Sequence, residues 1–127
     1  MDLSQITQNE LHRMNLINPV TGKPVEDDNG EAMWIEVYGA DTRPYRNAMA
    51  EVARSLIGVE ERKDNEAEVL SLLAAVTANW HVQINGEHPE CTTEAVKELY
   101  SSQSWIKDQV DKSVHNRANF FEVASDN

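Results

Sequence analysis

Residues 105–121 read WIKDQVDKSVHNRANFF, and this stretch decides how the C-terminal third of the chain folds. Its apolar side chains recur at every fourth position, which predicts one long amphipathic helix. They are Ile106, Val110, Val114 and Ala118. The stretch ends in two adjacent aromatic residues, Phe120 and Phe121. Because neighbours on a helix point about 100° apart, we expect at least one of these rings at the surface or against a neighbouring subunit.

Three further helices are predicted upstream from the same helical spacing of apolar residues. Their expected bounds are 41–58, with Asp41 as N-cap and Gly58 as C-cap, then 66–80, ending at Trp80, and 93–100, with Thr92 as N-cap. The middle helix has the strongest apolar face, so we expect it at the centre of the core. A charged connection over residues 60–64 separates it from the first helix.

A β-hairpin is predicted at the front of the domain. Residues 32–38 are rich in β-branched and aromatic side chains, and alternate positions are apolar, which indicates a strand. Two prolines limit residues 18–25 to an edge strand or an extended loop. The Asn-Gly pair in the acidic segment 26–30 suits a tight turn between the two.

Residues 1–15 are expected to form a polar lead-in, with either one short helix around residues 3–11 or no fixed order. The remainder, residues 16–127, is predicted to be a single α+β domain, mostly α, in which the hairpin is followed by about four helices. The length of 127 residues and the mass of 14.3 kDa agree with one domain, since domains cluster at roughly 100–150 residues.

The chain carries 22 acidic against 11 basic residues, a formal net charge of −11. Nucleic-acid binding depends on lysines and arginines that displace counterions, so we expect neither nucleic acid nor a membrane surface as a partner. A strongly acidic surface also keeps a protein dissolved while it handles aggregation-prone partners. An acidic inhibitor that mimics DNA is a minor alternative, because the carboxylates are scattered over predicted loops and several helices.

The sequence indicates a cytoplasmic protein. Its N-terminus has neither a basic start nor an apolar run, so no signal peptide is predicted. The longest apolar run lies within residues 69–78, well short of the roughly 20 residues that span a bilayer. The single cysteine, Cys91, excludes an internal disulfide and suits a reducing compartment.

No reactive constellation is found in the sequence, so we expect a protein that is not an enzyme and needs no cofactor. There is no Gly-x-Ser-x-Gly elbow, no phosphate-binding glycine loop and no nucleophile paired with a base. His81, His88 and Cys91 lie close in sequence, but they lack the paired spacing of zinc ligands. We therefore predict no metal site.

Several short motifs follow one another over residues 14–121. They are NPVTG at 18–22, VYG at 37–39 with Asp41 and YR at 45–46, LLAAVT at 72–77 with Trp80, then Thr92, EAV at 94–96, LY at 99–100, WI at 105–106, QV at 109–110 and NRANF at 116–120. In this order they resemble the tail assembly chaperones of long-tailed (siphovirus-type) bacteriophages. The C-terminal motifs are the most specific part. Members of that family often have aspartate in place of Asn116 and leucine in place of Phe121.

The resemblance implies a chaperone that coats the long, helical, aggregation-prone tape measure protein until tube subunits polymerise around it. It implies action in the host cell cytoplasm, absence from the mature virion, and self-association. Such chaperones commonly exist in two forms, and the longer, frameshifted form recruits the tail tube protein. Amphipathic helices of the partner would lie in apolar grooves, and many copies along one target would bind through avidity.

Seven residues are predicted to bind the partner. They are Trp105, Ile106, Val110, Phe120 and Phe121, with Trp34 and Tyr38 as a second patch. Packing within the core would explain most of them equally well. The main alternative function is a structural head–tail connector or tail-completion protein, which would be found in purified particles.

Overall fold

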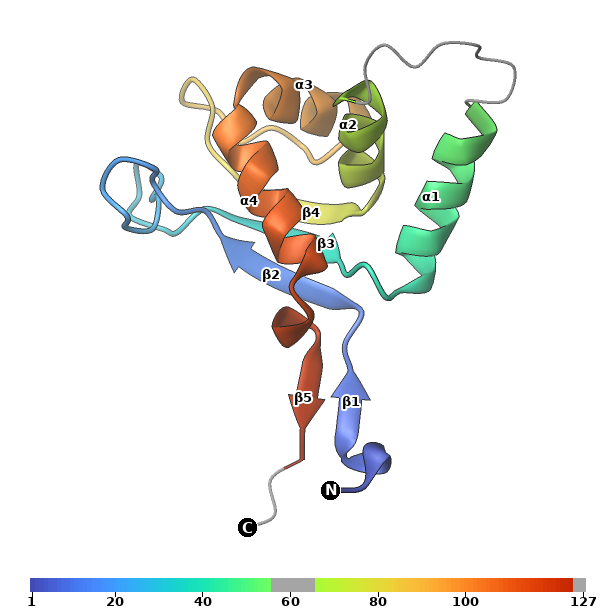
Figure 1. Ribbon diagram of the computed structural model, residues 1–127. Helices are drawn as coiled ribbons and strands as arrows, with labels where there is room; N and C mark the ends of the chain where they lie inside the picture. Colours follow the sequence, from blue (N-terminus) through green and yellow to red (C-terminus); the bar gives the residue numbers. More distant parts are fainter. Residues whose placement is uncertain (56–65, 125–127) are drawn as a thin grey trace.

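The computed structural model describes residues 1–55 and 66–124. Within them the chain forms four α-helices, two short 3₁₀ turns (η) and two antiparallel sheets (Figure 1). In order these are η1 (Leu3–Gln5), β1 (Ile6–Gln8), β2 (Leu11–Asn15), β3 (Trp34–Tyr38), α1 (Arg43–Ser55), α2 (Glu66–Ala75), β4 (Thr77–His81), α3 (Thr93–Ser102), α4 (Ser104–His115), η2 (Arg117–Asn119) and β5 (Phe121–Val123). The predicted α+β class and the four helices are confirmed.

The larger sheet has the strand order β2-β3-β4. Its register places Met14 and Trp80 on either side of Ile35, and all three side chains are buried. Strand alternation turns this row toward the helices and leaves the other face more open. The register shifts between Glu36, which pairs with Asn79, and Val37, which pairs with Thr77, so Ala78 of β4 is an extra residue at this point.

The predicted hairpin is present only in part, as a turn in which the Gly30 amide donates to the Asp27 carbonyl and as an isolated bridge between Glu26 and Ala32. The partner of β3 is β2, which lies inside the expected polar lead-in, and no helix covers residues 3–11 beyond η1. Residues 18–25, predicted as an edge strand or an extended loop, form no regular strand and make a turn closed by a bridge between Ile17 and Pro24. The Asn18 carboxamide accepts hydrogen bonds from the amides of Val20 and Thr21, and Gly22 has a φ of 71°, which suits glycine.

The helix expected over residues 66–80 ends early. It stops at Ala75, and residues 77–81 become β4 at the edge of the sheet. Trp80 is still a core residue, 6% exposed, but it is placed by strand pairing with Ile35. The apolar spacing of this segment fitted a helix because a short buried strand and a helix turn can share the same pattern.

Helices α2, α3 and α4 gather on one side of the larger sheet, while α1 stands beside them and contacts α2 (Figure 1). The core draws side chains from all four helices and from β2, β3 and β4. Tyr100 of α3 is buried there, and its hydroxyl forms a 2.7 Å hydrogen bond with Thr77 Oγ1. Burial raises the pKa of Tyr100, so the phenol stays neutral.

Helix α4 is shorter than the predicted C-terminal helix. It ends at His115, and Ala118 is exposed within η2. The Asn116 side chain accepts a hydrogen bond from the Ala118 amide, which turns the chain away from the helix axis. The Asn119 amide group then donates to Ser113, back on α4.

The start of α1 differs slightly from the prediction. Thr42, not Asp41, caps the helix, because its hydroxyl accepts a hydrogen bond from the Tyr45 amide. Asp41 instead receives two hydrogen bonds from the Arg117 guanidinium at 2.8 and 3.0 Å. The expected cap at Gly58 and the charged connection over residues 60–64 lie outside the described residues.

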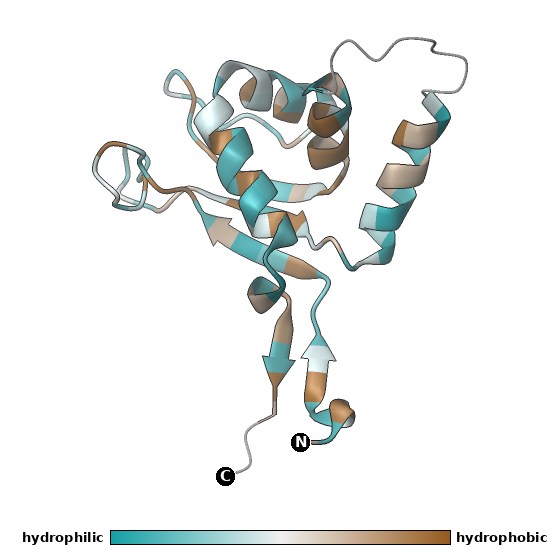
Figure 2. Ribbon diagram, viewed as in Figure 1, coloured by the Kyte–Doolittle hydropathy of each residue, from teal (hydrophilic) through white to brown (hydrophobic). Residues whose placement is uncertain are grey.

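The smaller sheet is a two-stranded ribbon made of β1 and β5, which brings the two ends of the chain together away from the helices (Figure 1). The ribbon contains hydrophobic residues (brown in Figure 2), although most of its residues are exposed. Leu3 and Val123 are 82% and 58% exposed. Among the described helices, none is both long and apolar enough to cross a membrane.

Candidate functional site

An apolar groove of about 480 Å³ opens beside the corner where α3 meets α4. This volume lies in the range of roughly 300–1,000 Å³ that is typical of binding pockets. Three parts of the chain supply its apolar lining: Leu16, Val25 and Met33 from the loop after β2, Val82, Ile84 and Pro89 from the segment after β4, and Ala95, Leu99, Trp105 and Ile106 from α3 and α4. The groove can therefore accept apolar side chains from a partner.

Two glutamines fasten the loop that forms one wall of the groove. Gln109 of α4 accepts a hydrogen bond from the Ile17 amide at 2.9 Å and donates to the Ile17 carbonyl at 2.7 Å. Gln83 accepts from the Asp28 amide at 2.7 Å and donates to the Asp28 carboxylate at 2.7 Å. These contacts hold the wall in place, which lowers the ordering cost of binding a partner.

Trp105 is half-buried in the lining of the groove. Its indole nitrogen donates a 2.9 Å hydrogen bond to the Gln103 carboxamide, which fixes the orientation of the ring. A held tryptophan offers a large apolar contact area and loses little conformational entropy on binding.

The charged residues around the groove are all of one sign. Among the described residues that line it, Glu87 and Glu98 are the charged ones, and both are acidic. An apolar segment flanked by lysines or arginines would therefore be favoured over one flanked by carboxylates.

The structure separates the five C-terminal residues that were predicted to bind. Trp105 and Ile106 both line the groove, but Ile106 is only 5% exposed and also belongs to the core. Val110 and Phe120 are 0% and 2% exposed, so they belong to the core and offer no surface to a partner. Phe121 is half-buried at the start of β5. These five residues do not form one continuous binding surface.

The second predicted patch lies on a different face. Trp34 and Tyr38 sit at alternate positions of β3 with Glu36 between them, opposite the buried face of the strand. Both aromatic side chains are half-buried. The Arg13 guanidinium lies 3.7 Å from the centroid of the Trp34 ring, which covers part of it.

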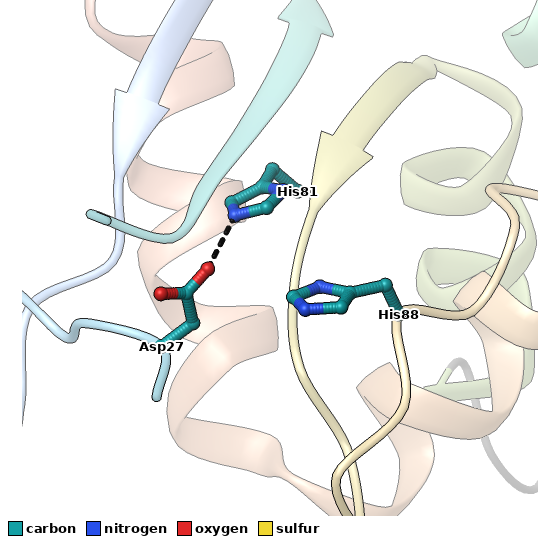
Figure 3. A group of neighbouring side chains, drawn as sticks. All are labelled: Asp27, His81 and His88. Carbon is teal, nitrogen blue, oxygen red and sulfur yellow. Dashed lines mark hydrogen bonds and ion pairs between the residues drawn. The ribbon is translucent and has the colours of Figure 1, made fainter. Parts of the chain in front are cut away.

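A second candidate group of side chains lies next to Trp34, where Asp27, His81 and His88 meet (Figure 3). The Asp27 carboxylate is buried and accepts a 2.8 Å hydrogen bond from His81 Nε2. The rings of His81 and His88 stack with centroids 5.1 Å apart. The amide hydrogen bond from Glu31 lowers the pKa of Asp27, and the His81 side chain adds to this effect against the opposing effect of burial.

This cluster differs from the set weighed in the sequence. His81 and His88 do come together, but the third member is Asp27 and not Cys91. Burial raises the pKa of the Cys91 thiol, which makes it a poorer ligand. Asp27 could not be chosen from the sequence because it lies 54 residues before His81. The only local signal was the turn Asp27-Asp28-Asn29-Gly30, in which the Asp27 carboxylate accepts hydrogen bonds from the amides of Asn29 and Glu31.

Comparisons of the chain with known protein families, with curated proteins and with solved structures found no match.

Proposed function

We propose that this protein is a non-enzymatic tail assembly chaperone that holds apolar helices of a phage tape measure protein in the groove beside α3 and α4. The observation that carries the proposal is that the groove is lined mainly by apolar side chains and that its two charged lining residues, Glu87 and Glu98, are acidic. The order of sequence motifs described above supplies the identity of the partner.

The groove suits one face of an amphipathic helix. Its lining is mainly apolar, and the half-buried Trp105 is already held by Gln103. A helix that binds in such a groove contributes side chains at positions i, i+3 or i+4 and i+7. Each groove would cover a short part of a long helical target, so several copies acting together would keep that target in solution.

The net charge of −11 supports the same role. Copies that coat one target would present like-charged surfaces to solvent, and their repulsion would oppose aggregation of the coated assembly. At the groove itself, Glu87 and Glu98 would select basic residues beside the apolar face of the bound helix.

Co-expression with a phage tape measure protein tests the proposal. We expect that partner to become soluble and to co-purify with this chain. A partner that stays insoluble, together with the detection of this chain in purified particles by mass spectrometry, would instead favour a structural tail component.

Two neighbouring serines of α3 provide a matched pair of variants. Ser102 lines the groove, whereas Ser101 lines a separate hollow beside α2. Both are exposed, and each hydroxyl donates to the carbonyl three residues earlier. Ser102→Arg should fill the groove, place a cation in it and abolish solubilisation of the partner, while Ser101→Arg should not. Equal behaviour of the two variants would show that the partner does not use this groove.

A further inference from the structure

We propose that Asp27, His81 and His88 form a binding site for a divalent transition-metal ion such as Zn²⁺, with Glu31 as a fourth ligand. One ligand atom from each of the first three residues lies within 4.8 Å of the others. Imidazole nitrogen and carboxylate oxygen are ordinary zinc ligands. This site does not depend on what binds in the groove.

The two distances from His81 to neighbouring carboxylates lie on either side of the spacing in a tetrahedral site. With zinc–ligand bonds of about 2.0–2.1 Å, ligand atoms of a tetrahedron lie about 3.3 Å apart. His81 Nε2 lies 2.8 Å from a carboxylate oxygen of Asp27 and 3.5 Å from one of Glu31. An ion would take the place of the proton that His81 now shares with Asp27.

His88 is prepared to supply the remaining nitrogen. Its Nδ1 lies 3.2 Å from the carbonyl oxygen of Val82. A carbonyl can only accept, so Nδ1 carries the proton, and the lone pair of the neutral ring is on Nε2. This contact is the kind that orients histidine ligands in metal sites. His88 is exposed, and its ring points toward the Asp27–His81 pair (Figure 3). Because the two imidazole rings are stacked at an interplanar angle of 17°, the His88 ring must turn for its nitrogen to reach an ion.

The carboxylate of Asp27 is held in position before an ion binds. It is buried and accepts hydrogen bonds from the amides of Asn29 and Glu31 through one oxygen, which leaves the other directed at His81. The His81 ring also stacks on the Trp34 ring with centroids 6.3 Å apart, and this contact limits rotation of the His81 side chain.

An ion at this site would link the loop before β3 to the end of β4 and the segment after it, which come much later in the sequence. Asp27 and Glu31 belong to the loop before β3, His81 ends β4, and His88 lies in the segment that follows. The same loop and segment provide two walls of the apolar groove. Metal binding would therefore stiffen these walls relative to each other.

Calorimetric titration of the untagged, EDTA-treated chain with ZnCl₂ tests the site. We expect one Zn²⁺ per chain, and titration with Co²⁺ should give the visible absorption of a tetrahedral ion. His88→Gln should weaken Zn²⁺ binding about tenfold or more, since it removes one ligand. Because His88 is exposed, this variant should fold, which far-UV circular dichroism would verify.

His115→Gln is the matched control. His115 is also an exposed histidine next to a carboxylate, with Nδ1 3.2 Å from Asp111, but it lies outside the cluster. We expect this variant to bind Zn²⁺ as the unaltered chain does. The proposal would be overturned if the unaltered chain failed to bind one equivalent of Zn²⁺, or if the two histidine variants lost affinity equally.

Discussion

At the scale of single residues, the contact between Gly39 and Phe120 joins the end of β3 to the C-terminal segment. A Cβ atom added to Gly39 would lie 2.8 Å from Phe120 Cγ, closer than packed atoms allow. The Phe120 ring is buried and meets the His12 ring edge-on at 5.8 Å. Phe120, which was predicted from the sequence to bind a partner, is thus a packed residue of the core.

Gly39→Ala should destabilise the fold by about 1–3 kcal/mol, because the methyl group must displace a buried ring. Urea unfolding measures this loss. The double variant Gly39→Ala with Phe120→Leu should be more stable than the sum of the two single losses predicts, because leucine is smaller than phenylalanine and leaves room for the added methyl group. Strictly additive losses, or no loss for Gly39→Ala, would mean that the contact is not tight.

His12 should make the stability of the protein depend on pH. Burial lowers the pKa of its imidazole in the folded state. The unfolded chain therefore binds the proton more readily, so the contribution of His12 is complete above the unfolded pKa of about 6.5 and is lost as the pH falls from there through the lower pKa of the folded state. We expect the unfolding free energy to decrease from pH 7.5 to 5.5, and His12→Leu to decrease less. An identical decrease in both proteins would contradict this.

At the scale of elements, the ribbon of β1 and β5 is a short sheet that lies outside the core. Its pairing rests on three residues in each strand, from Ile6 opposite Val123 to Gln8 opposite Phe121. A two-stranded ribbon without a covered face is at best marginally stable in water. Its side chains are mostly exposed.

We expect the ribbon to open locally while the larger sheet stays closed. Amides of β1 and β5 should exchange with solvent deuterium faster than those of β3 by about two orders of magnitude or more, because local opening needs less free energy than unfolding of the core. Hydrogen exchange followed by mass spectrometry resolves the two sheets. Equal protection would show that the ribbon unfolds only with the core.

At the scale of the whole molecule, the buried side chains of both described parts of the chain belong to one core. The three tryptophans lie in different parts of the fold: Trp80 in this core, Trp34 on the open face of the sheet and Trp105 in the groove. A single core predicts one cooperative unfolding transition.

Tryptophan fluorescence and far-UV circular dichroism should therefore give the same unfolding midpoint in urea. The unfolding free energy should fall by about 1–3 kcal/mol per molar urea. Trp105→Phe, which keeps an aromatic ring in the groove, would remove the groove signal and should leave the midpoint of the fluorescence curve close to that of circular dichroism. Separate midpoints would mean that the groove region unfolds independently of the sheet.

Several elements could be predicted from the sequence because their signals are local. Helix α3 begins after Thr92, whose side chain accepts a hydrogen bond from Ala95 as the capping pattern predicts. The buried face of α4 follows the spacing of its apolar residues as far as Val114. In β3, period-two alternation separates buried from more open positions. In each case, residues within a few positions of one another carry the information.

The remaining features depend on residues that are distant in the chain, and only the tertiary structure decided them. The sequence did not indicate that β3 would pair with β2, because both the turn residues and the lead-in allowed other pairings. Gln109 reaches Ile17 across 92 positions, and Asp27 reaches His81 across 54. The sequence by itself determined the α+β class and most of the helices, since hydrophobic periodicity and caps act locally. The groove and the histidine cluster exist only because packing brings distant segments together, and short-range patterns do not specify such contacts.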